Sequence, residues 1–230
     1  MREWVIPAAG AEFVCAMEDV LDVYARVYNE ENPVVCFDES PKQLVSEVRK
    51  PYIDQHGVKH EDCEYKREGA AELFMIVEPL GKRREVSVEE DHTGNTWARK
   101  IAQIAEEMYP NAKKITLIQD NLSAHKKYNL YNVFEPNRAR AIIDRIEFIY
   151  TPKHGSWLNI AECELSVIKR QALDKRFASK QELKIQVDHW VEKRNNMQKG
   201  IDWQFKTKDA RIKLKKLYPT VILLDKTEEQ

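Results

Sequence analysis

The order of apolar segments along the chain limits the possible folds more than any other feature of the sequence. Residues 72–78 and 84–89 have the composition of strands and are joined by a Pro-Leu-Gly turn, which indicates a hairpin. Segments with helical and with strand-like spacing alternate after this hairpin. A hairpin followed by such alternation predicts a mixed α/β sheet with helices on both faces.

The remaining segments follow from periodicity and from helix start and stop signals. Asn32-Pro33 ends the first helix, and Thr93 and Pro110 bound a later one. In chain order, we expect a helix over 10–30, a strand over 34–38, a polar loop over 40–70, strands over 72–78 and 84–89, a helix over 93–109, a strand over 113–120, a basic helix over 136–144, a strand over 146–150, helices over 157–176 and 180–196, and a helix or tail over 207–217.

Composition excludes several classes of protein. The 230 residues carry a net charge of −1, so charge alone gives no support for nucleic-acid binding, although basic residues can still gather on one face. No apolar run is long enough to span a membrane, and the first ten residues lack an export pattern. There are only 7 glycines and no phosphate-binding glycine motif. The 4 cysteines are widely spaced, which favours reduced thiols and a cytoplasmic location.

Two strand-like runs end in an aspartate: VVCFD at Asp38 and ITLIQD at Asp120. Either residue alone is well explained as the start of a turn. The helix after Trp157, however, adds Glu162 and Glu164 in its first turn. Carboxylates that meet at one sheet edge repel each other, and divalent cations relieve that repulsion. Together these acids indicate a metal site for phosphoryl transfer.

Three segments carry a resemblance to a known family: VVCFDESPKQLV, LIQDNLSAHK and TPKHGSWLNIAECELSVIKR. They resemble the three catalytic blocks of bacterial insertion-sequence transposases related to the mariner group. These belong to the DDE superfamily and have a ribonuclease H-like fold. The resemblance runs from about Trp4 to Trp190. It implies that Asp38, Asp120 and Glu162 are the catalytic residues and the ligands of two Mg²⁺ or Mn²⁺ ions.

Helical periodicity leaves Glu162 and Glu164 on opposite flanks of an apolar stripe and does not choose between them. The family pattern selects Glu162, so we expect Glu164 to be solvated or to lie behind the metal ligands. Glu39 follows Asp38 directly and would point to the other face of a strand, as a surface or salt-bridged acid. For His125, hydrogen bonding or solvation is a more economical explanation than a ligand role.

The resemblance implies strand cleavage at transposon ends, followed by transfer of the 3′-hydroxyl into target DNA. The implied partner is duplex DNA, bound by a homodimer at the bacterial nucleoid. We predict DNA contacts by residues of the hairpin turn and of the loops beside the acids: Lys82, Arg83, Arg84, Lys126, Lys153, His154 and Trp157. For Trp157, core packing is the stronger alternative.

We divide the chain into a helical lead-in at 1–33, a catalytic domain at 34–200 and a C-terminal helix or tail at 201–230. Relatives usually carry a helix-turn-helix region before the catalytic domain, and only some 37 residues precede Asp38 here, so we expect that region to be absent. This favours, as an alternative, a catalytically idle remnant that binds DNA or a partner transposase. A third possibility is a ribonuclease H-like nuclease with another substrate.

Overall fold

The sheet at the centre of the molecule has five strands. In the computed structural model, which describes residues 10–49, 52–60 and 63–219, the strand order is β5-β4-β1-β6-β7. Strand β1 pairs antiparallel with β4 and parallel with β6, so the predicted mixed sheet is confirmed. The strands are β1 (Val34–Glu47), β4 (Tyr65–Glu78), β5 (Arg83–Glu89), β6 (Ile115–Gln119) and β7 (Ile146–Tyr150).

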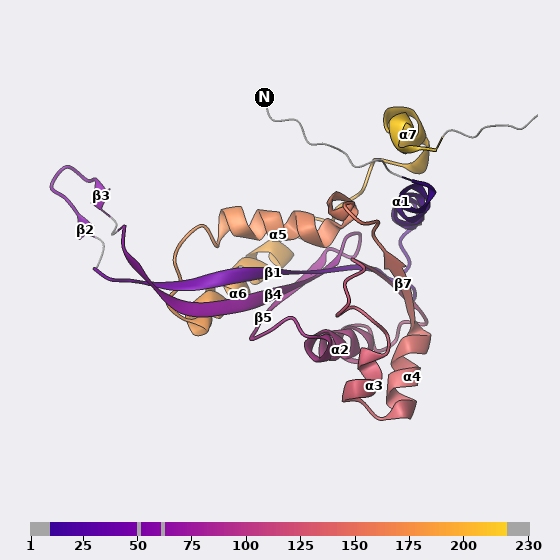
Figure 1. The fold of residues 1–230 in the computed structure, drawn as a ribbon, viewed down its shortest axis with the longest axis horizontal. Coiled ribbons are helices and arrows are strands. Elements are labelled where there is room, and N and C mark those ends of the chain that lie inside the picture. The colour runs from indigo at the N-terminus through magenta and orange to yellow at the C-terminus, as the bar shows by residue number, and fades with distance from the viewer. Residues whose placement is uncertain (1–9, 50–51, 61–62, 220–230) are drawn as a thin grey trace, which may run out of the picture.

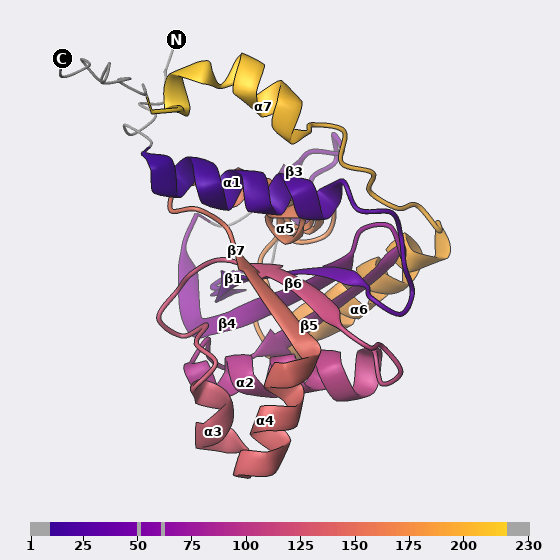
Figure 2. The ribbon, with the colours of Figure 1, turned by 90° about the vertical axis from the view of Figure 1, so that its right-hand side faces the viewer.

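Helices cover both faces of this sheet, with a separate apolar core on each side (Figures 1 and 2). Alternate residues of each strand supply the two cores: Cys36 packs on one side, and Val35 and Phe37 on the other. The first side holds α1 (Ala11–Tyr24), α5 (Ile160–Gln171), α6 (Lys180–Asn196) and α7 (Thr207–Lys213); the second holds α2 (Gly94–Ala102), the π-helical η1 (Gln103–Met108), α3 (Asn129–Val133) and α4 (Pro136–Arg145).

The predicted polar loop over 40–70 is wrong for much of its length. Strands β1 and β4 continue through it as a long antiparallel ribbon, with β2 (Tyr52–Ile53) and β3 (Lys59–His60) paired near its tip (Figure 1). Pro41 argued against a strand because it cannot donate to a ladder. However, the pairing of β1 with β6 covers only Val34 to Cys36, so Pro41 lies where one edge of β1 is free of β6.

Several predicted boundaries also shift. The first helix ends at Tyr24 rather than near residue 30, and the short helix α3 was not predicted. The predicted helix over 93–109 begins as expected, with the Thr93 side chain accepting from the Thr96 N–H, but its last part is π-helical. The predicted strand over 146–150 and helix over 180–196 are confirmed residue for residue.

The two ends of the described chain share one core. Met17 of α1 and Ala210 of α7 are fully buried in the same cluster, and Arg211 forms an ion pair with Glu18. Figure 2 shows α1 and α7 side by side. Two short 3₁₀ turns complete the element list, η2 (Ser156–Leu158) and η3 (Lys215–Leu217). Among the described residues, no helix is both long and apolar enough to cross a bilayer.

Candidate active site

The two aspartates lie at the same level of neighbouring parallel strands. The β1–β6 register pairs Val34 with Thr116 and Cys36 with Ile118. Extending this register by two residues places Asp38 opposite Asp120, at the end where β6 stops. The sheet therefore brings together two acids that are 82 positions apart in the sequence, as the register of 34 with 116 already implies.

The third acid comes from helix α5, which lies over this end of the sheet. Asp38, Asp120 and Glu162 line a single cleft of about 210 Å³. Its other walls come from β1, from the loop before α5 and from α5 itself: Glu39, Ser40, Thr151, Ser156, Asn159, Leu165, Ser166 and Lys169. The helix carries Glu162 to the cleft because its apolar stripe, which includes Leu165 and Ile168, is buried against the sheet.

Asn159 connects the start of α5 to strand β1. Its side-chain oxygen accepts from the N–H of Ala161 at 3.1 Å, which caps the helix. Its amide donates to the Phe37 carbonyl at 2.9 Å and to Asp38 Oδ2 at 3.2 Å. Asn159 is only 1% exposed. A single buried amide thus fixes the distance between the strand that carries Asp38 and the helix that carries Glu162.

The cleft concentrates negative charge. Burial and the nearby carboxylate of Glu39 raise the pKa of Asp38 to about 7, and Asp120 and Glu162 add to the effect, although the N–H of Glu39 opposes it by hydrogen bonding. Glu162 Oε2 is buried and has no hydrogen-bond partner. Crowded carboxylates with an unpartnered buried oxygen are the environment that a divalent cation stabilises.

The residues therefore fit a hard divalent cation in their chemistry. They are not, however, drawn together into a ready coordination shell: in the described part of the chain, no three His, Cys, Asp or Glu side chains are close enough to hold one ion. Mg²⁺ often binds through one or two carboxylates and keeps several waters, with phosphate oxygens completing the shell. The cleft thus matches a site that is completed by a phosphate substrate.

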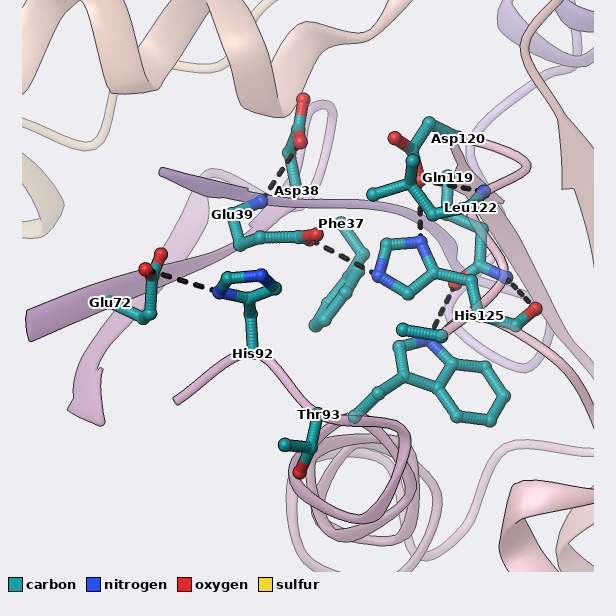
Figure 3. Close-up of polar contacts among 12 residues, drawn as sticks. Phe37, Asp38, Glu39, Glu72, His92, Thr93, Gln119, Asp120, Leu122 and His125 are labelled. Atoms are coloured by element: carbon teal, nitrogen blue, oxygen red, sulfur yellow. Dashed lines mark hydrogen bonds and ion pairs between the residues drawn. The ribbon is translucent and has the colours of Figure 1, made fainter. Parts of the chain in front are cut away.

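His125 lies between two of the acids that surround the cleft (Figure 3). Its Nδ1 is 2.5 Å from Asp120 Oδ1 and its Nε2 is 3.2 Å from Glu39 Oε2. Burial acts against a charged ring, but the two carboxylates outweigh it and raise the pKa of His125 to about 9. Asp38 and Glu39 project to opposite sides of β1, so Glu39 reaches the histidine from the face away from Asp38 (Figure 3).

The prediction that Glu164 is solvated or lies behind the metal ligands is wrong. Its side chain is 4% exposed and forms ion pairs with Arg84 at 2.7 Å and Arg194 at 2.9 Å. Burial alone would raise the pKa of Glu164, but the hydrogen bonds from Arg194 and Arg84 lower it below the usual value. This cluster joins β5, α5 and α6 and has a structural role.

The predicted DNA contact by Arg84 does not fit this cluster, because the Arg84 side chain is only 1% exposed and is paired with Glu164. Lys82 and Arg83 are exposed, but their turn follows Glu78, whereas Asp38 pairs with Met75 three positions earlier on β4. The turn therefore lies toward the start of β1, away from the cleft. Arg83 also donates to the Met108 carbonyl at 3.0 Å. The hairpin turn is not part of the candidate site.

The other four predicted DNA-contact residues are close in sequence to residues of the cleft but do not line it, and their contact with DNA stays a prediction. Lys153, His154 and Trp157 are exposed in the loop that connects Thr151 and Ser156, two cleft residues, to α5. Trp157 is 41% exposed, and its ring packs against Phe205 of the core with ring centroids 6.4 Å apart, so it combines partial packing with an exposed face. Lys126 donates to the side chain of Asn121, the residue after Asp120.

Two cleft residues were missed as functional candidates. Asn159 stands in the WLN segment, and an Asn before an apolar helix is a cap signal that points to its role in positioning α5. Lys169 lies seven residues after Glu162, so both occupy one face of α5. That spacing is present in the sequence and could have indicated the shared face.

Residues 33–184 match the family described as DDE superfamily endonuclease. The chain belongs to this family. The match contains all three acids of the cleft of this DDE endonuclease, and the predicted superfamily is confirmed. No curated protein matches the chain.

Solved structures of Mos1 mariner transposase share the fold of this DDE endonuclease. The Mos1 paired-end complex with Mn is 17% identical, with a TM-score of 0.53, over 84% of this chain and 59% of that one. A pre-cleavage Mos1 transpososome is 15% identical, with a TM-score of 0.55, over 86% of this chain and 65% of that one. The chain thus spans about three-fifths of the length of these proteins. The predicted ribonuclease H-like fold is confirmed.

Proposed function

We propose that this DDE endonuclease is the catalytic domain of a DNA transposase that cleaves DNA at transposon ends and transfers the freed 3′-hydroxyl into target DNA. One observation carries the proposal: Asp38, Asp120 and Glu162, which the family resemblance selects from the sequence, line one cleft. In this proposal they are the catalytic residues, and they hold two Mg²⁺ or Mn²⁺ ions. Mos1 structures with Mn and with Mg support this choice of cation.

When bound, such ions stabilise the attacking and leaving oxygens of an in-line phosphoryl transfer. In the first step a water oxygen attacks phosphorus, and the bond to the 3′-oxygen breaks to leave a 3′-hydroxyl. In the second step this hydroxyl attacks a phosphodiester of the target, whose own 3′-oxygen leaves. The protein contributes the three carboxylates, the amide of Asn159 that orients Asp38, and the low exposure that strengthens these interactions.

The partner in this proposal is duplex DNA, which approaches from the mouth of the cleft. In this proposal Lys126, Lys153, His154 and Trp157 contact its backbone or its bases. We further propose that residues 34–200 carry the chemistry and that α1 and α7 complete the core beneath it. Assembly on two DNA ends requires two active sites, so we propose a homodimer on DNA.

Nicking of supercoiled plasmid tests the proposal. The plasmid carries the DNA that flanks the coding region, and the reaction contains Mg²⁺ or Mn²⁺. We expect the wild type to nick and Asp120→Ala to reduce nicking at least a thousandfold, by about 4 kcal/mol of lost transition-state stabilisation. Asp144→Asn is the matched control, since Asp144 lies on α4 in an exposed pair with Arg140.

The alternative of a catalytically idle remnant has one observation in its favour: no three candidate ligands in the described residues already form a coordination shell. The same assay separates the two functions. If the wild type and Asp120→Ala bind DNA equally and cut it equally poorly, the chain is an idle remnant. Preferential cutting of RNA–DNA hybrids would instead identify a ribonuclease H-like nuclease.

A further inference from the structure

The histidine beside the cleft is held on every side. The His125 residue is 1% exposed, and its ring packs against Trp97, with ring centroids 6.0 Å apart and planes 23° apart. The Phe37 ring meets it edge-on at 5.7 Å. Trp97 is itself fixed in place, because its indole N–H donates to the side-chain oxygen of Gln119 at 2.9 Å (Figure 3). The imidazole therefore has little freedom to rotate.

Such a ring does not need two carboxylates in order to be buried. A neutral imidazole in an apolar environment needs a partner for only one N–H. Here Asp120 and Glu39 form ion-pair contacts with the two ring nitrogens, although Nδ1 and Glu39 Oε2 do not meet hydrogen-bond geometry in this arrangement. The Glu39 side chain is 8% exposed, and the Asp120 side chain is 33% exposed toward the cleft. The three side chains thus form a line from the protein interior to the candidate metal site.

The contacts to Asp120 all use one oxygen. His125 Nδ1 and the N–H of Leu122 both approach Oδ1. No described residue forms a hydrogen bond or an ion pair with Oδ2. One carboxylate oxygen is therefore anchored by the protein, and the other is available to a cation.

We propose that His125 is a positioning residue, which holds Asp120 through Oδ1 so that Oδ2 faces the metal, and that Glu39 in turn holds His125. This rests on the proposed function, in which Asp120 is a metal ligand. It assigns Glu39 a role distinct from that of Asp38: it anchors the histidine from the opposite face of β1 and is not a metal ligand. Supporting residues of this kind are worth about 10–100-fold in metal affinity.

Two neutral amides separate this role from simple core packing. In His125→Asn the amide nitrogen takes the place of Nδ1 and still faces Asp120. In His125→Gln it takes the place of Nε2 and faces Glu39 instead. Both variants lose the ring and its charge, so a purely structural role predicts equal effects.

Mn²⁺ alone is the probe, with free Mn²⁺ measured by electron paramagnetic resonance and folding checked by thermal unfolding. We expect His125→Gln to weaken Mn²⁺ binding about tenfold or more and His125→Asn to stay within about threefold of the wild type. Equal weakening in both variants would overturn the proposal. If both variants fail to fold, Glu39→Gln decides: we expect about tenfold weaker Mn²⁺ binding, and an unchanged affinity would contradict the role of Glu39.

A wild type that neither nicks DNA nor binds Mn²⁺ would contradict the proposed function. Crystal structures of the two amide variants test the positioning role of His125 even in that case. We expect Asp120 to keep its side-chain rotamer in His125→Asn and to turn away in His125→Gln. The same rotamer in both variants would show that His125 does not position Asp120.

Discussion

The side-chain amide of Asn159 donates to Asp38 Oδ2 at 3.2 Å, while its oxygen caps helix α5 through the N–H of Ala161 at 3.1 Å. Glu162 follows three residues later, in the first turn of that helix. Asn159 therefore sets the position of one acid of the cleft relative to another. It also replaces some of the hydration that Asp38 loses through burial.

Substitutions at Asn159 separate capping from positioning. Asn159→Ser keeps a capping oxygen but loses the donor to Asp38. We expect it to lower the free energy of unfolding by about 1–3 kcal/mol, because the buried Phe37 carbonyl also loses its donor, and to lower nicking by about 10–100-fold, because a hydrogen bond to a charged group contributes about 1.5–3 kcal/mol. Urea unfolding and plasmid nicking measure the two effects. Nicking at the wild-type rate would show that Asp38 does not need this amide.

The raised pKa of Asp38 predicts how stability depends on pH. Between its ordinary value of 3.8 and its folded value of about 7, the native state holds a proton that the unfolded state has lost. This contribution to stability is present at low pH and is lost as the pH rises through about 7. Asp38→Asn has no such loss, so it should be about equal in stability to the wild type near pH 4 and more stable by up to about 4 kcal/mol near pH 8.

Thermal or urea unfolding from pH 4 to pH 8, without divalent cations, measures this difference. Adding Mn²⁺ at high pH should stabilise the wild type and leave Asp38→Asn unchanged, because a bound cation neutralises the repulsion only where the carboxylate is present. A stability difference that stays constant over the whole pH range would contradict the assignment of the shift to Asp38.

The parts of the fold that the sequence predicts well are those with strong local signals. The strand over 146–150 and the helix over 180–196 have clear periodicity and end signals, and both are confirmed. The prediction of a polar loop over 40–70 was wrong because proline is a local signal against a strand. Pro41 is tolerated because β6 pairs with β1 only as far as Cys36. The local sequence around Pro41 does not show where that pairing ends.

The candidate site shows the same division. The two aspartates that follow apolar runs were predicted to lie close together at one sheet edge. The parallel pairing of β1 with β6 brings these positions together. The pairing of Arg84 with Glu164 was not predictable, because the two residues are 80 positions apart and meet only in the folded chain. The line from Glu39 through His125 to Asp120 likewise depends on the loop after β6, which packs the His125 ring against Phe37 and Trp97.

The buried pair of Arg84 and Glu164 predicts a large effect on stability. We expect Arg84→Ala to lower the free energy of unfolding by about 3–5 kcal/mol, because it leaves the Glu164 charge buried with one partner fewer. Urea unfolding measures this. Arg83→Ala is the matched control, since the Arg83 side chain is 44% exposed, and it should change stability by less than about 1 kcal/mol.

A double variant tests the reason for this loss. Arg84→Met combined with Glu164→Gln removes both charges at similar volume, so it should recover at least half of the stability lost in Arg84→Ala. If the double variant is no more stable than Arg84→Ala, the loss comes from packing of the arginine stem rather than from an uncompensated carboxylate.

The basic loop before α5 predicts how DNA binding depends on salt. Lys153 is exposed beside the cleft, and a lysine that contacts a phosphate releases one counterion. Lys153→Ala should therefore weaken binding to duplex DNA at every sequence and reduce the slope of log affinity against log salt by about 1. Fluorescence anisotropy between about 50 and 200 mM salt measures the slope.

Lys113 provides the control for that measurement. It precedes β6 and pairs with Glu31 at 2.6 Å, so it lies at the end of the strand opposite Asp120. Lys113→Ala should leave the slope unchanged. A Lys153→Ala slope equal to that of the wild type would place the DNA elsewhere on the molecule, because a phosphate contact at the mouth of the cleft cannot be lost without a change in counterion release.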